Sequence, residues 1–330
     1  MPTIALALVL LASAPADGQV LSESRPTMGT LATVTIAGVP EGGARAGIEA
    51  AFAVFARVDW SMNEWRPDSP LSALNARAGD GWVPLPGDLC EVLRLAKRGA
   101  RRTGGLFDPT WAALSDLWRF DGQGAGAPEP ERLRAACRLV DHPGLELRSR
   151  AGPLCEARLV RAGMKVGLGG IAKGWALDAA ARSLRALGYR DFLLQAGGDL
   201  YAAGRRGGAP WRVDVRDPRG GRLDAITSVE VSDQAFSTSG DYEQYFEKDG
   251  RREHHLIDPR TCEPARASRA VSVLARSAVD AEILGKALFA AGGREALALA
   301  TRHGAEAIVV TAAGDLLATP GLRHALPGGR

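Results

Sequence analysis

A glycine-rich turn that carries a lysine is the sharpest chemical feature of the sequence. Residues 166–174 read VGLGGIAKG and precede a helix predicted over 174–187, so Lys173 stands at a helix start. Glycines let backbone N–H groups approach a ligand, and a helix N-terminus attracts anions. The turn therefore suits a pyrophosphate, although its spacing matches neither GxxxxGK[ST] nor GxGxxG. A tight turn with a solvated lysine is the structural alternative.

Three further segments present polar side chains beside turns. Residues 103–110 read TGGLFDPT, residues 197–199 read GGD at the end of a predicted strand, and residues 254–261 read HHLIDPRT. His255 is able to act as an acid, a base or a ligand near neutral pH. A single histidine is more often structural, so these segments gain meaning only in combination.

Composition indicates a globular α/β-type protein and excludes few functions. The chain has 330 residues, is 46% hydrophobic and carries a net charge of +3. Its basic residues are spread along the sequence, which gives no case for DNA or any other nucleic acid as a partner. The length allows one compact unit.

The N-terminus resembles a secretory signal. Residues 4–14 read IALALVLLASA, too short for a membrane span, and residues 14–16 read APA, a small-x-small cleavage pattern. Residues 1–3 lack the usual basic residue, and no cysteine follows to carry a lipid anchor. We expect a signal peptide over 1–16, a mature domain over 17–330, and a periplasmic location.

Four cysteines, Cys90, Cys137, Cys155 and Cys262, stand at wide and irregular spacings. The absence of a CxxC pair disfavours a zinc site. An oxidising compartment would allow one disulfide, for which Cys137 and Cys155 are the predicted partners; four unpaired cysteines are the alternative.

Strand and helix patterns are interleaved along the chain, and several neighbouring strands are joined by short turns. This favours an α+β architecture with mixed, largely antiparallel sheets. The predicted strands lie at 31–38, 156–168, 191–196, 211–216, 226–232, 270–275, 306–310 and 315–318. The predicted helices lie at 42–58, 88–103, 174–187, 279–291 and 294–302, with a short one near 71–74 and an exposed loop at 121–130.

In this order, the polar and glycine-rich segments resemble the ApbE family, the FAD:protein FMN transferases. The matching blocks are 28–30, Met62 with 65–69 and 74–75, 105–110, 169–174 with Asp178, 197–199, 239–240 and 255–261. The resemblance implies an ApbE-like domain with a flavin-binding cleft. It covers nearly the whole mature chain.

The resemblance also implies roles for individual residues. The residues that would line the FAD site are Met28, Trp65, Leu106, Phe107, Asp108 and Lys173. Gly170 would face a divalent metal, usually Mg²⁺, and His255 would help to deprotonate the acceptor hydroxyl. FAD is then the substrate: FMN passes to a Thr or Ser hydroxyl of a partner protein, and AMP leaves. The implied partner is an exported or membrane-bound electron-transfer flavoprotein subunit.

Three positions depart from the family pattern. Gly167 replaces an acid before the glycine turn, so one polar contact to FAD is missing. Glu282 and Lys286 stand where the family has metal ligands, and an ammonium cannot coordinate a cation. We expect Lys286 to replace the metal; a solvated i,i+4 ion pair is the alternative. Cys262 replaces a glycine, which predicts a changed turn conformation.

These departures leave two other functions open. A non-catalytic FAD-binding protein would retain the site without the transfer. An FAD pyrophosphatase would give the same phosphorus to water and release FMN and AMP. The sequence identifies neither the acceptor nor the oligomeric state.

Overall fold

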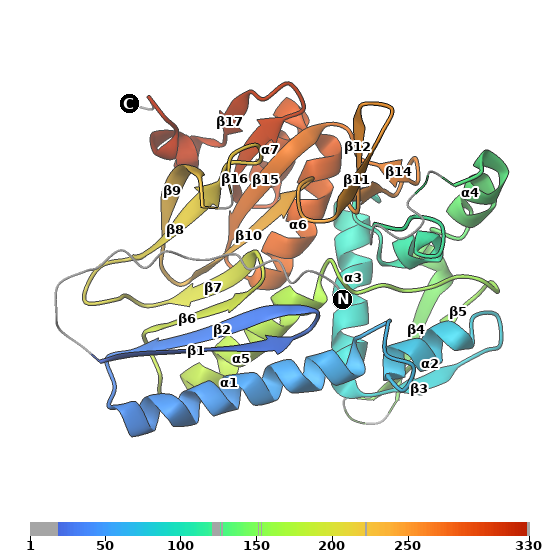
Figure 1. Cartoon of the computed structure of the whole chain (residues 1–330). Helices are drawn as coiled ribbons and strands as arrows, with labels where there is room; N and C mark the ends of the chain where they lie inside the picture. The colour runs from blue at the N-terminus through green and yellow to red at the C-terminus, as the bar shows by residue number, and fades with distance from the viewer. Residues whose placement is uncertain are drawn as a thin grey trace.

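Eight strands form one antiparallel sheet in the computed structural model, which describes residues 19–120, 126, 128–150, 152, 154–221 and 223–328 (Figure 1). In spatial order the strands are β1 (Val20–Thr27), β2 (Thr30–Ala37), β6 (Phe192–Ala196), β7 (Asp199–Ala203), β10 (Gln234–Gly240), β15 (Ser268–Ala275), β16 (Glu306–Thr311) and β17 (Leu316–Ala318). Strand side chains alternate between two faces. In β6, Phe192 and Leu194 pack into one core cluster and Leu193 into another, so the sheet is covered on both faces.

Helices build the larger core on one face of the sheet. They are α1 (Glu41–Ser61), α2 (Pro70–Ala76), α3 (Gly87–Arg102), α5 (Ala172–Ala186), α6 (Ala278–Ala291) and α7 (Gly293–Arg302), while α4 (Pro130–Cys137) lies outside this core. Helix α5 packs against both α1 and α6, and α6 packs against β10 and β15 (Figure 1). The Ser277 hydroxyl caps α6 by accepting the N–H of Asp280. Asp178 of α5 accepts the N–H groups of Ala278 and Val279, which bonds α5 to the start of α6.

The other face of the sheet carries a smaller core. The hairpin of β8 (Trp211–Arg216) and β9 (Ala225–Val231) covers it together with the 3₁₀ segment η3 (Pro320–Ala325). The remaining short strands of the described chain form three small sheets, the first of which packs into the larger core, and two 3₁₀ turns accompany them. They are β3 (Val83–Leu85) with β5 (Cys155–Leu159) and β4 (Leu145–Ser149), β11 (Tyr245–Lys248) with β12 (Arg251–His254), β13 (Ile257–Asp258) with β14 (Glu263–Pro264), η1 (Pro109–Leu114) and η2 (His142–Gly144).

The cysteines form two disulfides, and neither is the predicted one. Cys90 is bonded to Cys155 and Cys137 to Cys262. The predictions of a Cys137–Cys155 bridge and of unpaired thiols are both wrong. The pairing of β5 with β3 places Cys155 beside Cys90 of α3. Cys137 of α4 instead meets Cys262, which lies much later in the chain. Such contacts join residues 65 and 125 positions apart, which local spacing does not reveal.

The predicted α+β class with antiparallel sheets is confirmed, and most predicted elements lie within a few residues of their observed bounds. Of the main sheet, strands β1, β7 and β10 are absent from the predictions, and β1 is an edge strand of alternating exposure without an apolar run. The strand predicted over 156–168 ends early, at Leu159.

The predicted signal peptide over 1–16 and most of the predicted loop over 121–130 lie outside the described residues. Pro130, the last residue of that loop, begins α4. In the described part of the chain, no helix has both the length and the apolar character needed to cross a membrane.

Candidate active site

The glycine turn before α5 sets the position of Lys173. The backbone N–H of Ala172 donates to the carbonyl of Leu168 at 2.8 Å, so the chain turns tightly into the helix. A β-carbon at Gly174 would stand 2.4 Å from the carbonyl oxygen of Ala278, the first residue of α6. Only glycine allows this approach. It presses the N-terminus of α5, with Lys173, against α6.

Lys173 lies in a buried cluster of charges. Its ammonium contacts the carboxylates of Glu282 and of Asp199, the latter at 3.0 Å. Glu282 is fully buried, and its second oxygen accepts the N–H of Gly174 at 2.7 Å. Asp199 also accepts a hydrogen bond from the hydroxyl of Ser237. Burial opposes the charge of Lys173, but the two carboxylates outweigh it and raise its pKa, so it is protonated at neutral pH.

Lys286 brings a second ammonium group, one turn after Glu282 on α6. Its Nζ donates to the hydroxyl of Ser239 at 3.0 Å, and its Cγ lies 3.5 Å from where a β-carbon of Gly170 would stand. The alternative of a solvated Glu282–Lys286 ion pair is wrong, because Glu282 is buried and pairs with Lys173. Burial lowers the pKa of Lys286 from its ordinary value.

This donor set does not fit Mg²⁺. The ion requires oxygen ligands in near-octahedral geometry. Asp199 and Glu282 offer oxygens, but both already contact the ammonium of Lys173. The ammonium of Lys286 has no lone pair and would repel a cation. Among the residues that the structure describes, no group of three or more His, Cys, Asp or Glu side chains is arranged to hold a metal.

His255 follows β12 and lies within electrostatic reach of Lys286. Its backbone N–H donates to the carbonyl of Gln244 at 3.1 Å, and its Nδ1 lies 3.3 Å from the same oxygen. A carbonyl only accepts, so Nδ1 carries the proton and Nε2 keeps a free lone pair. Burial, the Lys286 ammonium and His254 lower the pKa of His255 to about 3. The imidazole is therefore neutral at neutral pH, the form that accepts a proton.

Met28 and Trp65 are held by short polar anchors. Met28 has φ of 50°, unusual for a residue with a β-carbon, and occupies the two-residue turn between β1 and β2 with Gly29. Its N–H donates to Asp59 at 3.0 Å. Trp65 follows α1, its N–H donates to the side chain of Asn63, and its side chain is 70% exposed. The indole face is open for stacking.

Residues 106–108 form a buried turn after α3. Phe107 contacts the position of Gly170, where a β-carbon would lie 3.2 Å from its ring. The FAD contact expected for Asp108 stays a prediction, and protein donors reach both of its oxygens. One accepts Thr110 N at 2.8 Å and the other accepts His142 Nδ1 at 2.9 Å. The Asp108 side chain shapes the turn, which leaves Leu106 and Phe107 as its apolar surface.

Glu64 is a polar residue that the sequence patterns did not single out. Its Oε1 lies 3.0 Å from where a β-carbon of Gly167 would stand, and it accepts the N–H of Leu168. Burial raises the pKa of Glu64, while that N–H opposes the rise. Gly167 thus leaves room for a carboxylate from a distant segment. No local signal connects two residues so far apart in the chain.

The structure therefore brings together Lys173, Lys286, Gly170, Phe107 and His255 from four separate segments. A cavity of about 310 Å³ lies elsewhere, between α3, α5 and α6, and its lining includes Arg98, Trp175 and Asp178 but none of these five residues. This cavity is therefore not the flavin-binding cleft that the resemblance implies. That cleft stays a prediction.

Known proteins share this chain's pattern and fold. The model of the ApbE family matches residues 28–309. The FAD:protein FMN transferase of Treponema pallidum is 33% identical over 291 residues, which cover 84% of this chain and 80% of that protein.

Two solved structures are similar throughout. The ApbE protein of Thermotoga maritima superposes with a TM-score of 0.85 at 28% identity, covering 94% of this chain and 100% of that one. The flavinyl transferase ApbE of Pseudomonas stutzeri gives a TM-score of 0.81 at 29% identity, covering 94% and 97%. The chain belongs to the ApbE family.

Proposed function

We propose that this chain is an FAD:protein FMN transferase. The observation that carries the proposal is the convergence of two lysine ammonium groups, Lys173 and Lys286, on the glycine turn at the start of α5. A pyrophosphate is the diphosphate anion that such a site suits. Membership of the ApbE family supports FAD as the molecule that contains it.

The reaction moves one phosphoryl group. The oxygen of an acceptor Thr or Ser hydroxyl forms a bond to the phosphorus on the FMN side of the FAD pyrophosphate. The bond from that phosphorus to the bridging oxygen breaks, and the bridging oxygen leaves with AMP. Negative charge grows on the phosphoryl and leaving oxygens, so fixed positive charge nearby lowers the barrier.

Lys173 and Lys286 supply that positive charge in this chain. Lys173 is held in place by Asp199 and Glu282, so it needs no reorganisation during the reaction. Among the described residues, the Nζ of Lys286 donates a hydrogen bond only to the neutral hydroxyl of Ser239, which leaves its charge available to an anion. A bound pyrophosphate would also restore the pKa of Lys286 toward its ordinary value. No step is assigned to a metal.

His255 receives the proton of the acceptor hydroxyl. Its Nε2 lone pair is free when Nδ1 faces the Gln244 carbonyl. In the free protein its pKa of about 3 makes it a weak base. Pyrophosphate would offset the Lys286 charge that depresses this pKa and would strengthen the base on substrate binding.

The remaining parts of FAD contact side chains around the glycine turn. We place the exposed indole of Trp65 against an aromatic ring of FAD, with Met28, Leu106 and Phe107 as apolar contacts. The carboxylate of Glu64 supplies the acid that the glycine turn itself lacks at Gly167.

The acceptor and location form part of the same proposal. We place the protein in the periplasm or on the exterior of the cell envelope, after cleavage near residue 16, with an exported or membrane-bound electron-transfer flavoprotein subunit as acceptor. Two disulfides suit an oxidising compartment.

The test is to incubate the purified protein with FAD and a polypeptide that bears a flavinylation-type Thr, and to measure AMP and the acceptor's intact mass. AMP with a mass gain of one FMN supports the transferase. AMP with free FMN and an unmodified acceptor would identify a pyrophosphatase. Bound, intact FAD without AMP under any condition would identify a non-catalytic flavin binder.

A further inference from the structure

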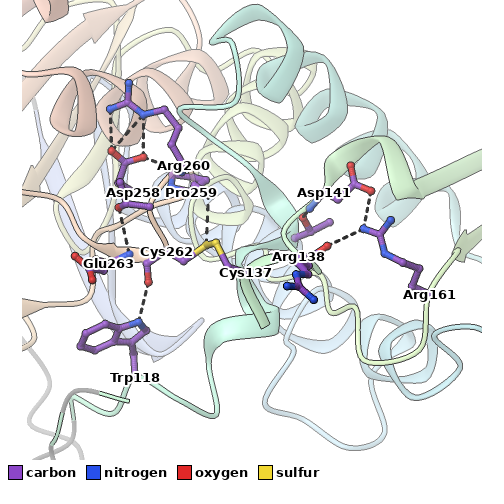
Figure 2. Close-up of a disulfide and its surroundings, with 12 residues drawn as sticks. Trp118, Cys137, Arg138, Asp141, Arg161, Asp258, Pro259, Arg260, Cys262 and Glu263 are labelled. Carbon is purple, nitrogen blue, oxygen red and sulfur yellow. Dashed lines mark hydrogen bonds and ion pairs between the residues drawn. A yellow bond between two sulfur atoms is a disulfide. The ribbon is translucent and has the colours of Figure 1, made fainter. Parts of the chain in front are cut away.

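The Cys137–Cys262 disulfide closes the turn that follows His255 in the chain. It joins the last residue of α4 to the residue between β13 and β14, with Cα atoms 5.8 Å apart (Figure 2). Cys262 is fully buried and has φ of 61°, so the predicted change of the turn is wrong and the left-handed conformation is present. That conformation is unfavourable for a residue with a β-carbon. The cross-link holds Cys262 there.

The position of the turn is transmitted to His255 through a short ladder of hydrogen bonds. Strands β13 and β14 pair Asp258 with Glu263, and the N–H of Ala265 donates to the carbonyl of Leu256 at 2.9 Å. The preceding His254 contacts the same segment, with its Nε2 2.9 Å from the carbonyl of Ala265. The backbone that follows His255 is therefore fixed by the β13–β14 hairpin, and Cys262 is the last residue of the turn in that hairpin.

Contacts within the turn do not fix its place relative to the rest of the protein. Asp258 accepts the N–H and guanidinium of Arg260, and its carbonyl accepts Cys262 N at 2.7 Å (Figure 2). These bonds shape the turn from inside. Outside it, Trp118 Nε1 donates to the Cys262 carbonyl at 2.9 Å.

The surroundings of the bridge form a small satellite core. Among the described residues, it contains the buried Leu114, Trp118 and Cys262, and none of the residues of α4 is buried. Because so little apolar surface holds α4, the disulfide is the strong connection between α4 and the turn.

We propose that the Cys137–Cys262 disulfide positions His255 for the transfer reaction, and that a dithiol lowers turnover by reducing it; this rests on the proposed function. A thiolate of the dithiol attacks the sulfur of Cys137, which is partly exposed, and Cys262 leaves as a thiolate. The second thiol of the reagent then displaces Cys137. Two electrons pass to the bridge, the dithiol becomes a cyclic disulfide, and both cysteines take up protons.

The experiment compares the oxidised protein, the protein in excess dithiothreitol, and two variants. Cys137→Ala breaks the bridge but leaves Cys262 in the turn. Cys137→Ala with Cys262→Gly also relieves the left-handed strain. We expect kcat to fall about 10- to 100-fold, as for small misplacements of catalytic groups, with KM for FAD changed by less than about threefold. Hydrogen exchange of residues 254–265 should rise, while that of α5 and α6 stays unchanged.

Cys90→Ala with Cys155→Ala is the matched control, since that bridge lies in the main core away from this turn. Dithiothreitol should still lower the turnover of the control, whereas it should not change the turnover of the variants that lack Cys137. Unchanged exchange of residues 254–265 on loss of the bridge would overturn the proposal, and so would full turnover in the Cys137→Ala protein. Absence of transfer in the oxidised wild-type protein would overturn the proposed function instead, because the exchange measurement still reports on the bridge.

Discussion

Replacing Lys286 by methionine removes a charge while it retains most of the side-chain volume. The Lys286 stem packs beside Gly170, and among the described residues its Nζ has only the Ser239 hydroxyl as a hydrogen-bond partner. The fold should therefore tolerate the change. At about 4 Å from a phosphoryl oxygen, one unit charge contributes about 4 kcal/mol at an effective dielectric constant of about 20, and about 1 kcal/mol in bulk water.

Lys286 is partly exposed, so the expected effect lies between these limits. We expect kcat/KM for FAD to fall about 10²-fold, since each 1.36 kcal/mol corresponds to a factor of ten. AMP release, followed by chromatography, gives the rate. Lys165→Met is the control: Lys165 pairs with Asp116 at the surface and should change the rate by less than about twofold. A Lys286→Met protein that works within about threefold of wild type would refute the role of its charge in the reaction.

Three further predictions concern single residues of the site. Trp65→Ala should weaken FAD binding about 5- to 100-fold, as loss of one stacking platform does, while Trp60→Ala, also exposed, should not; calorimetric titration with FAD distinguishes them. Gly174→Ala should destabilise the protein by several kcal/mol, roughly 3, because its β-carbon would stand 2.4 Å from the backbone oxygen of Ala278; an unchanged urea midpoint would contradict this close approach. The pKa of His255 is about 3 in the folded protein and ordinarily 6.5, so the unfolded chain binds the proton more readily. The free energy of unfolding should therefore be highest above pH 6.5 and should fall as the pH drops toward 3. The acid limb of kcat/KM should likewise lie well below pH 6, and a limb near 6.5 in the pH–rate profile would show that the free histidine is unperturbed.

Local sequence signals were sufficient for the elements that position Lys173. The glycines of 166–174 predicted a tight turn into a helix, and the structure has α5 beginning at Ala172. The period of the apolar residues likewise predicted α6, on which Glu282 and Lys286 lie.

Contacts between distant segments were not predictable in the same way. Glu282 and Lys286 have the i,i+4 spacing of an ion pair, but the preference of Glu282 for Lys173 follows from the burial of α6 against α5. Glu64 approaches Gly167 only because the chain folds back over the glycine turn. Cysteine spacing also failed, since both disulfides join elements that lie together only in the tertiary fold.

In the proposed reaction, two lysine charges serve the transfer of FMN from FAD to a protein hydroxyl. The most direct test is a single-turnover reaction with FAD and a Thr-bearing acceptor in excess EDTA, in which AMP and acceptor-bound FMN are both quantified. We expect equal amounts of AMP and covalent FMN, formed at the rate seen with Mg²⁺. Activity that disappears in EDTA and returns with Mg²⁺ would contradict catalysis by the two lysine charges without a metal.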